Sequence, residues 1–119
     1  MRVLIIESRK RLAHLWMRHI ERQGAEVFLA TSTTDAIRTV REYKIDVIIL
    51  DLVLDEGSAM AVADYACYRR PEARVIYVTS TTFFSDGSVF AHMPNACGYV
   101  QTSTPPDDLA AMVEHLGTS

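Results

Sequence analysis

Five short aliphatic runs, spread along the whole chain, constrain its fold more than any other feature of the sequence. Several of them are unbroken apolar stretches rich in β-branched residues, without the alternation of apolar and polar residues that marks a half-exposed strand. Unbroken runs of this length are typical of parallel strands that are buried on both faces of a sheet. The runs are Val3–Ile6, Val27–Ala30, Val47–Leu50, Val75–Val78 and Cys97–Val100.

Helical patterns lie between these runs. The first has Leu12, Leu15, Trp16, His19 and Ile20 at i, i+3, i+4, i+7 and i+8, which places them on one helix face. Gly24 is expected to stop this helix. Thr33 or Thr34 is the expected N-cap of the second helix, and the third is alanine-rich and ends before Pro71. These three helices are predicted over residues 12–20, Thr34–Tyr43 and Ser58–Tyr68.

The last helix has the clearest signals at its ends. Thr104 is the predicted N-cap, Pro105 fits the first turn, and Gly117 is expected to end the helix. Between Ser80 and Pro94 the signals are weak, so we expect a short or irregular helix there. The chain therefore repeats a strand-helix unit five times, which predicts an α/β fold with a doubly wound parallel sheet in a single domain over residues 1–119.

Composition excludes several classes of function. With 119 residues, 49% of them hydrophobic and 23% charged, the chain can form one core, and its net charge of −3 argues against nucleic acid as the main partner. We expect neither a membrane span nor a signal peptide. The cysteines lack a pairing pattern, which favours a reduced, cytoplasmic protein. The basic triplet Arg9–Arg11 is interpreted as a solvated helix start in preference to a partner contact.

Polar residues follow the predicted strands, where α/β sheets bind their ligands. If the first and third strands are neighbours, Glu7 and Asp51 lie side by side, on the order of 5 Å apart at the backbone. Two carboxylates this close repel each other unless a cation lies between them. Mg²⁺ is the cation we expect, because it prefers oxygen ligands. Thr79 and Thr102 follow the fourth and fifth strands.

At these positions the chain resembles the receiver domain of two-component response regulators. The resemblance rests on "VLIIES", "IDVIILDLVLDEGS", "VIYVTS" and "GYVQTS" at four of the five predicted strands. It implies a flavodoxin-like sheet with strand order 2-1-3-4-5. It also implies that Asp51 accepts a phosphoryl group from a histidine kinase or phosphotransfer protein, that Thr79 contacts the phosphoryl oxygens, and that Tyr99 is the aromatic residue that moves on activation.

The chain departs from this family at several positions. Receiver domains usually have two acidic residues after the first strand and a lysine three residues after the aromatic. Here Ser8 stands in place of the second acid and Thr102 in place of the lysine. The resemblance implies that the backbone carbonyl of Val53 would join Glu7 and Asp51 as a metal ligand, with Ser8 a doubtful one. We therefore expect Mg²⁺ to bind weakly. Asp55 and Glu56 are interpreted as solvated loop charges.

Two functions from different classes remain open. The first is an atypical receiver that takes phosphate on Asp51, with no enzymatic activity beyond its own phosphorylation and dephosphorylation. The second is a pseudo-receiver, a protein-interaction module that works without phosphate. In that case Asp51 caps a turn, while Thr79 and Tyr99 are a strand-end hydroxyl and a half-buried aromatic. A hydrolase is disfavoured because no GxSxG motif is present. The oligomeric state, including a homodimer, and a place within a longer protein stay open.

Overall fold

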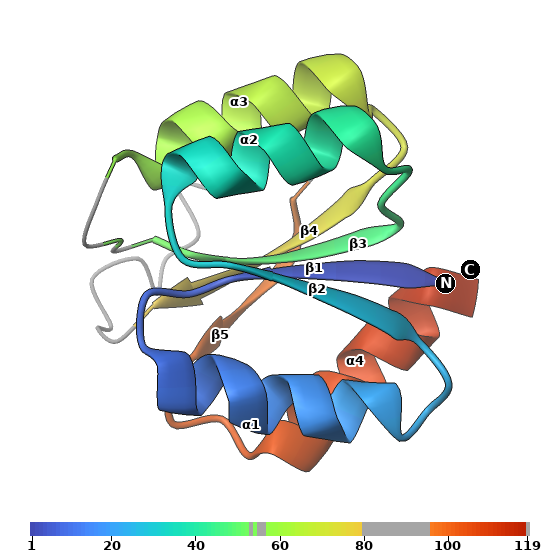
Figure 1. Cartoon of the computed structure of the whole chain (residues 1–119). Coiled ribbons are helices and arrows are strands. Elements are labelled where there is room, and N and C mark those ends of the chain that lie inside the picture. Colours follow the sequence, from blue (N-terminus) through green and yellow to red (C-terminus); the bar gives the residue numbers. More distant parts are fainter. Residues whose placement is uncertain (53, 55–56, 80–95, 119) are drawn as a thin grey trace.

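The five aliphatic runs form the strands of one parallel sheet (Figure 1). The computed structural model describes residues 1–52, 54, 57–79 and 96–118. In this part of the chain the strand order is β2-β1-β3-β4-β5, which confirms the predicted order and the doubly wound α/β class. Each strand agrees with its predicted run to within one residue at either end. The strands are β1 (Arg2–Ile6), β2 (Glu26–Ala30), β3 (Val47–Asp51), β4 (Arg74–Thr79) and β5 (Ala96–Gln101).

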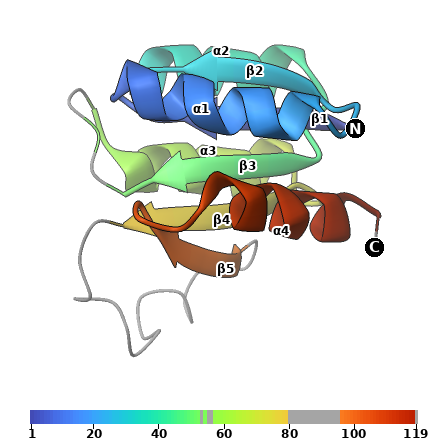
Figure 2. The same ribbon diagram turned by 90° about the horizontal axis from the view of Figure 1, so that it is seen from below.

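Helices cover both faces of the sheet. In Figure 1, α2 and α3 lie on one face and α1 and α4 on the other, and Figure 2 views the molecule from the side of α1 and α4. The helix predicted between Ser80 and Pro94 falls outside the described residues. In the part that is described, no helix is long and apolar enough to cross a membrane. The helices are α1 (Lys10–Glu21), α2 (Thr33–Glu42), α3 (Ala59–Arg69) and α4 (Pro106–Thr118).

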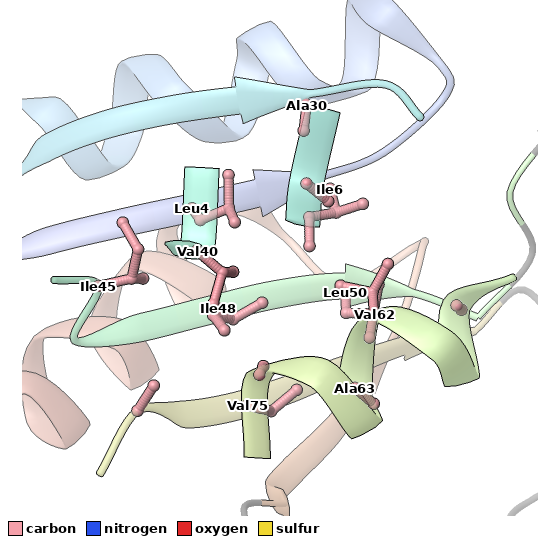
Figure 3. Close-up of a cluster of buried hydrophobic side chains, with 14 of the residues drawn as sticks. Leu4, Ile6, Ala30, Val40, Ile45, Ile48, Leu50, Val62, Ala63 and Val75 are labelled. Atoms are coloured by element: carbon pink, nitrogen blue, oxygen red, sulfur yellow. The ribbon is translucent and has the colours of Figure 1, made fainter. Parts of the chain in front are cut away.

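Both faces of the central strands are buried, which explains why their sequences are apolar without alternation. Successive side chains point to opposite faces, and each face has its own core. Figure 3 shows the core beneath α2 and α3, where Leu4, Ile48 and Leu50 pack against Val40 and Val62. The opposite core places Trp16 and Ile20 of α1 and Leu109 and Val113 of α4 against the alternate residues of the same strands, Val3, Ile5, Val47, Ile49, Ile76 and Val78.

The sequence predicted the end of α1 correctly and the start of α2 wrongly. Gly24 has a positive φ of 90°, and its N–H donates to the carbonyl of Glu21 at the end of α1, as expected. The predicted N-cap of α2 was wrong, because Thr33 is already helical. Ser32 is the cap, with an extended backbone and a side chain that accepts a hydrogen bond from the N–H of Asp35.

Both predicted ends of α4 were also wrong. The helix begins at Pro106, and the carbonyl of Pro105 accepts from the N–H of Leu109. Two prolines in a row both suit a first turn, so Thr104 lies before the helix and its N–H donates to Gln101. Gly117 lies within the helix. A glycine stops a helix by taking a positive φ, and the described glycines with positive φ are Gly24 and Gly57.

Candidate functional site

The ends of β1 and β3 bring two carboxyl groups together. Because the strands are parallel, their carboxyl ends share one edge of the sheet (Figure 2). Ile6, the last residue of β1, pairs with Leu50, and the residues that come next along the chain are Glu7 and Asp51. Glu7 is 0% exposed and Asp51 is 2% exposed. The structure thus places the two acids as neighbours, as the sequence predicted, and buries both.

Arg9 lies against both of these carboxyl groups. Its Nε donates to Glu7 Oε1 at 2.7 Å and its Nη2 donates to Glu7 Oε2 at 3.3 Å. The same Nη2 also donates to Asp51 Oδ2 at 2.8 Å. One guanidinium therefore binds Glu7 through two parallel hydrogen bonds and joins it to Asp51. Charge-assisted bonds of this forked kind are among the strongest in proteins.

The local backbone explains how Arg9 comes to this position. Arg9 precedes α1 as its N-cap residue and has an extended conformation, with φ −81° and ψ 101°. Its side chain makes no capping bond to the helix. Its backbone N–H donates to Glu7 Oε1 at 3.0 Å, which holds the chain in a tight turn after β1. The turn directs the guanidinium back over the strand ends, and the side chain stays 52% exposed.

The ion pairs also set the protonation of the site. Burial raises the pKa of Glu7, but hydrogen bonding with the Asp51 carboxyl and with Arg9 lowers it, and the net result is a pKa below the ordinary value of 4.5. The hydrogen bond to Glu7 raises the pKa of Arg9 above its already high ordinary value. Glu7 and Arg9 are therefore both ionised at neutral pH.

Thr79 and Thr102 lie at the same edge of the sheet. Asp51 pairs with Val78, so Thr79 is one residue beyond the partner of Asp51, and it is 3% exposed. The N–H of Thr102 donates to the carbonyl of Thr79 at 3.0 Å, which fixes the chain after β5 beside the end of β4. The structure thus brings Glu7, Asp51, Thr79 and Thr102 to one edge. Their roles in phosphoryl chemistry stay predictions.

Several predicted residues are not placed by the structure. Val53, Asp55 and Glu56 fall outside the described residues. Tyr99 lies in β5 opposite Tyr77, but its side chain is also outside the described part. Ser8 is partly buried in the turn between β1 and α1.

The sequence interpretation of Arg9 was wrong. It was grouped with Lys10 and Arg11 as a solvated helix start, whereas its guanidinium binds two buried acids. Two signals pointed to this role. Arg9 comes two residues after a strand-end carboxylate, and the predicted acidic pair required a cation between its members.

In this structure, the carboxyl groups of Glu7 and Asp51 are not arranged to bind a divalent metal ion. Both oxygens of Glu7 and Oδ2 of Asp51 accept hydrogen bonds from Arg9. Among the described residues there is no group of three or more histidine, cysteine, aspartate or glutamate side chains that could hold a metal ion. Mg²⁺ demands several oxygen ligands in near-octahedral geometry, and here a guanidinium already bonds to three of the four carboxylate oxygens of Glu7 and Asp51.

The sheet order defines a doubly wound α/β domain, and the two buried acids lie at the ends of β1 and β3, where the strand order reverses. Residues 3–114 match the family model of the response regulator receiver domain, and the chain belongs to that family. Phosphorylation on an aspartate is the general behaviour of the family, its members typically bind Mg²⁺, and they generally interact with histidine kinases or phosphotransfer proteins. No curated protein matches the chain in sequence.

Solved structures share the fold of this domain. A receiver domain protein (CheY-like) from Methanospirillum hungatei JF-1 has a TM-score of 0.88 and 20% identity, covering 98% of this chain and 93% of that one. The receiver domain of a putative Luxo repressor protein from Vibrio parahaemolyticus has a TM-score of 0.85 and 25% identity, covering 98% and 89%. A response regulator from Burkholderia pseudomallei, with a phosphorylated aspartic acid, calcium ion and citrate, has a TM-score of 0.81 and 22% identity, covering 96% and 71%.

Proposed function

We propose that this receiver domain accepts a phosphoryl group on Asp51 from a histidine kinase or phosphotransfer protein. One observation carries the proposal: the buried carboxyl group of Asp51, at the end of β3, is bonded to the positively charged guanidinium of Arg9. Asp51 ends the central strand at the edge where such sheets bind their ligands. We also propose a cytoplasmic location, which such a donor and the absence of a pairing pattern among the cysteines both favour.

The transfer is a simple exchange of bonds at phosphorus. An Asp51 carboxylate oxygen attacks the phosphorus of a phosphohistidine, and the O–P bond forms as the N–P bond breaks. The electron pair returns to the imidazole nitrogen, which takes up a proton, and Asp51 becomes an acyl phosphate. Most of the catalysis in such a transfer is positioning and electrostatic stabilisation. Arg9 supplies a positive charge beside Asp51, and the Thr79 hydroxyl is proposed to contact the phosphoryl oxygens.

The departures from the family weaken this chemistry without removing the acceptor. Losing one preorganised stabilising contact costs roughly 10²–10³ in rate at other electrostatic sites, which is the penalty we assign to Thr102 in place of lysine. The Arg9 guanidinium already bonds to both carboxyl groups between which Mg²⁺ was expected, so we assign no step of the transfer to a metal. We therefore propose a slow receiver, regulated mainly by its protein donor.

The test is intact mass after incubation with acetyl phosphate. Asp51 attacks phosphorus, acetate leaves, and the protein gains one phosphoryl group. The gain should be absent in Asp51→Asn and present in the control Asp64→Asn, which changes an exposed carboxylate on α3. Hydroxylamine should remove the added mass, because it cleaves acyl phosphates and leaves phosphoserine and phosphothreonine intact. A gain that persists in Asp51→Asn would place the acceptor elsewhere.

A second function is favoured by the same ion pairs. Arg9 bonds to Glu7 and Asp51 without any phosphoryl group, so the ion pairs alone fix the arrangement of this edge, and a phosphorylation-independent interaction module needs no more than that. Wild-type protein that gains no phosphoryl group, either from acetyl phosphate or from a histidine kinase, would support this module and contradict the proposal above.

A further inference from the structure

The Arg9 guanidinium occupies the place between two acidic side chains where a divalent cation would be needed. Glu7 and Asp51 come from neighbouring strands, both are buried, and Arg9 contacts both within 2.7–3.3 Å. We propose that Arg9 is the resident cation of this site and that phosphoryl acceptance on Asp51 does not depend on divalent metal. The second part of this inference rests on the proposed function; the first part does not.

The geometry of the guanidinium suits this role. It has five N–H groups in a rigid fork. One on Nε and two on Nη2 are used in the three bonds to Glu7 and Asp51. The two on Nη1 take no part in those bonds, and half of the side-chain surface remains exposed. Arginine binds phosphate through such paired donors. Arg9 can therefore hold Asp51 with one edge and donate to the oxygens of an incoming phosphoryl group with Nη1.

Charge supports the same conclusion. The described acids of the site are Glu7 and Asp51, and serine stands where the family has another acid. The Arg9 guanidinium offsets the charge of these two carboxyl groups, which are also hydrogen-bonded to each other, so the site needs no added ion for balance. A divalent cation in addition to Arg9 would lie next to a like charge and would have to break charge-assisted hydrogen bonds. The substitution at position 8 and the orientation of Arg9 are thus consistent with each other.

Arg9 also differs from the basic residues that follow it. Lys10, Arg11 and Arg18 line a shallow, open surface depression along α1, together with His14 and Leu15. Arg9 instead bonds to carboxyl groups that are almost completely buried. Arg11, exposed in the first turn of the same helix, is therefore a matched control: its replacement removes the same charge from nearby without touching the site.

The first test measures metal binding directly. Mg²⁺ and Mn²⁺ are titrated calorimetrically into wild type, Arg9→Ala, Arg9→Gln and Arg11→Ala. Removal of the guanidinium should release the carboxylates, so we expect both Arg9 variants to bind metal at least about tenfold more tightly than wild type and Arg11→Ala. Arg9→Gln keeps hydrogen-bond donors at this position, so the metal titration can be done on this variant if Arg9→Ala does not fold. Wild type binding metal as tightly as the Arg9 variants would overturn the proposal.

The second test measures phosphorylation by acetyl phosphate with EDTA or with Mg²⁺. The phosphorylation rate of wild type in EDTA should lie within about twofold of its rate with Mg²⁺. Arg9→Gln should be phosphorylated at least about tenfold more slowly than wild type in EDTA, and Mg²⁺ should restore its rate. Strong magnesium dependence of wild type, or faster reaction of Arg9→Gln than wild type in EDTA, would overturn the proposal. If no variant is phosphorylated, the proposed function fails, and calorimetry alone decides whether Arg9 is the resident cation.

Discussion

Replacing Arg9 by alanine should destabilise the fold measurably. Glu7 and Asp51 would stay buried without the guanidinium that contacts both, and removing one partner of a buried ion pair costs about 3–5 kcal/mol. Arg9 is 52% exposed, so water can enter the space it leaves, and we expect about 2–3 kcal/mol. At about 2.1 cal/mol/K per residue, unfolding of 119 residues has an entropy of about 0.25 kcal/mol/K, so Tm should fall by about 8–12 °C.

The assay is urea and thermal unfolding followed by circular dichroism at pH 7 in EDTA, so that no metal replaces the lost charge. Arg11→Ala, at an exposed position on α1, should stay within about 0.5 kcal/mol of wild type. Adding Glu7→Gln to Arg9→Ala should recover part of the loss, because one buried charge is removed. If Arg9→Ala alone lies within about 0.5 kcal/mol of wild type, the ion pairs do not hold the site together in solution, and the reasoning is refuted.

Three further predictions concern the acid, the turn and the missing lysine. Because folding lowers the pKa of Glu7, its contribution to stability is present above 4.5 and is lost as the pH falls below that value; the acid-induced loss of unfolding free energy should be smaller in Glu7→Gln. Gly57→Ala should destabilise more than Gly24→Ala in urea unfolding, since both have positive φ but only at Gly57 would the new Cβ overlap the Thr33 side chain. Thr102→Lys should speed phosphorylation of Asp51 about tenfold or more, and an equal effect of Thr102→Gln would show that charge is not the cause.

The fold could be predicted from the sequence because the residue pattern of each strand indicates whether one or both of its faces are buried. Val47–Leu50 and Val3–Ile6 are apolar at every position, and only a strand covered on both faces buries all of them. Helix ends were harder. Ser32, Thr33 and Thr34 are all competent N-caps, and sequence alone does not say at which of the three the backbone turns helical. At α4, two consecutive prolines created the same ambiguity.

The candidate site was predictable in part. Glu7 and Asp51 were expected as neighbours because both follow strands that the predicted order makes adjacent, and repulsion required a cation. The identity of that cation depends on tertiary structure. A short turn after β1, closed by the bond from the Arg9 backbone to Glu7, directs the guanidinium toward β3. No periodicity separates Arg9 from Lys10 and Arg11, so the sequence alone favoured a solvated helix start.

Localising the phosphoryl group tests the central claim most directly. Wild-type protein treated with acetyl phosphate is reduced with borohydride, which converts an aspartyl phosphate to homoserine, and the peptide that contains residue 51 is sequenced by mass spectrometry. We expect homoserine at position 51, formed in EDTA as readily as with Mg²⁺, and unmodified aspartate at Asp46 and Asp64. Homoserine at another position, or none in any condition, would contradict the assignment of Asp51 as the phosphoryl acceptor.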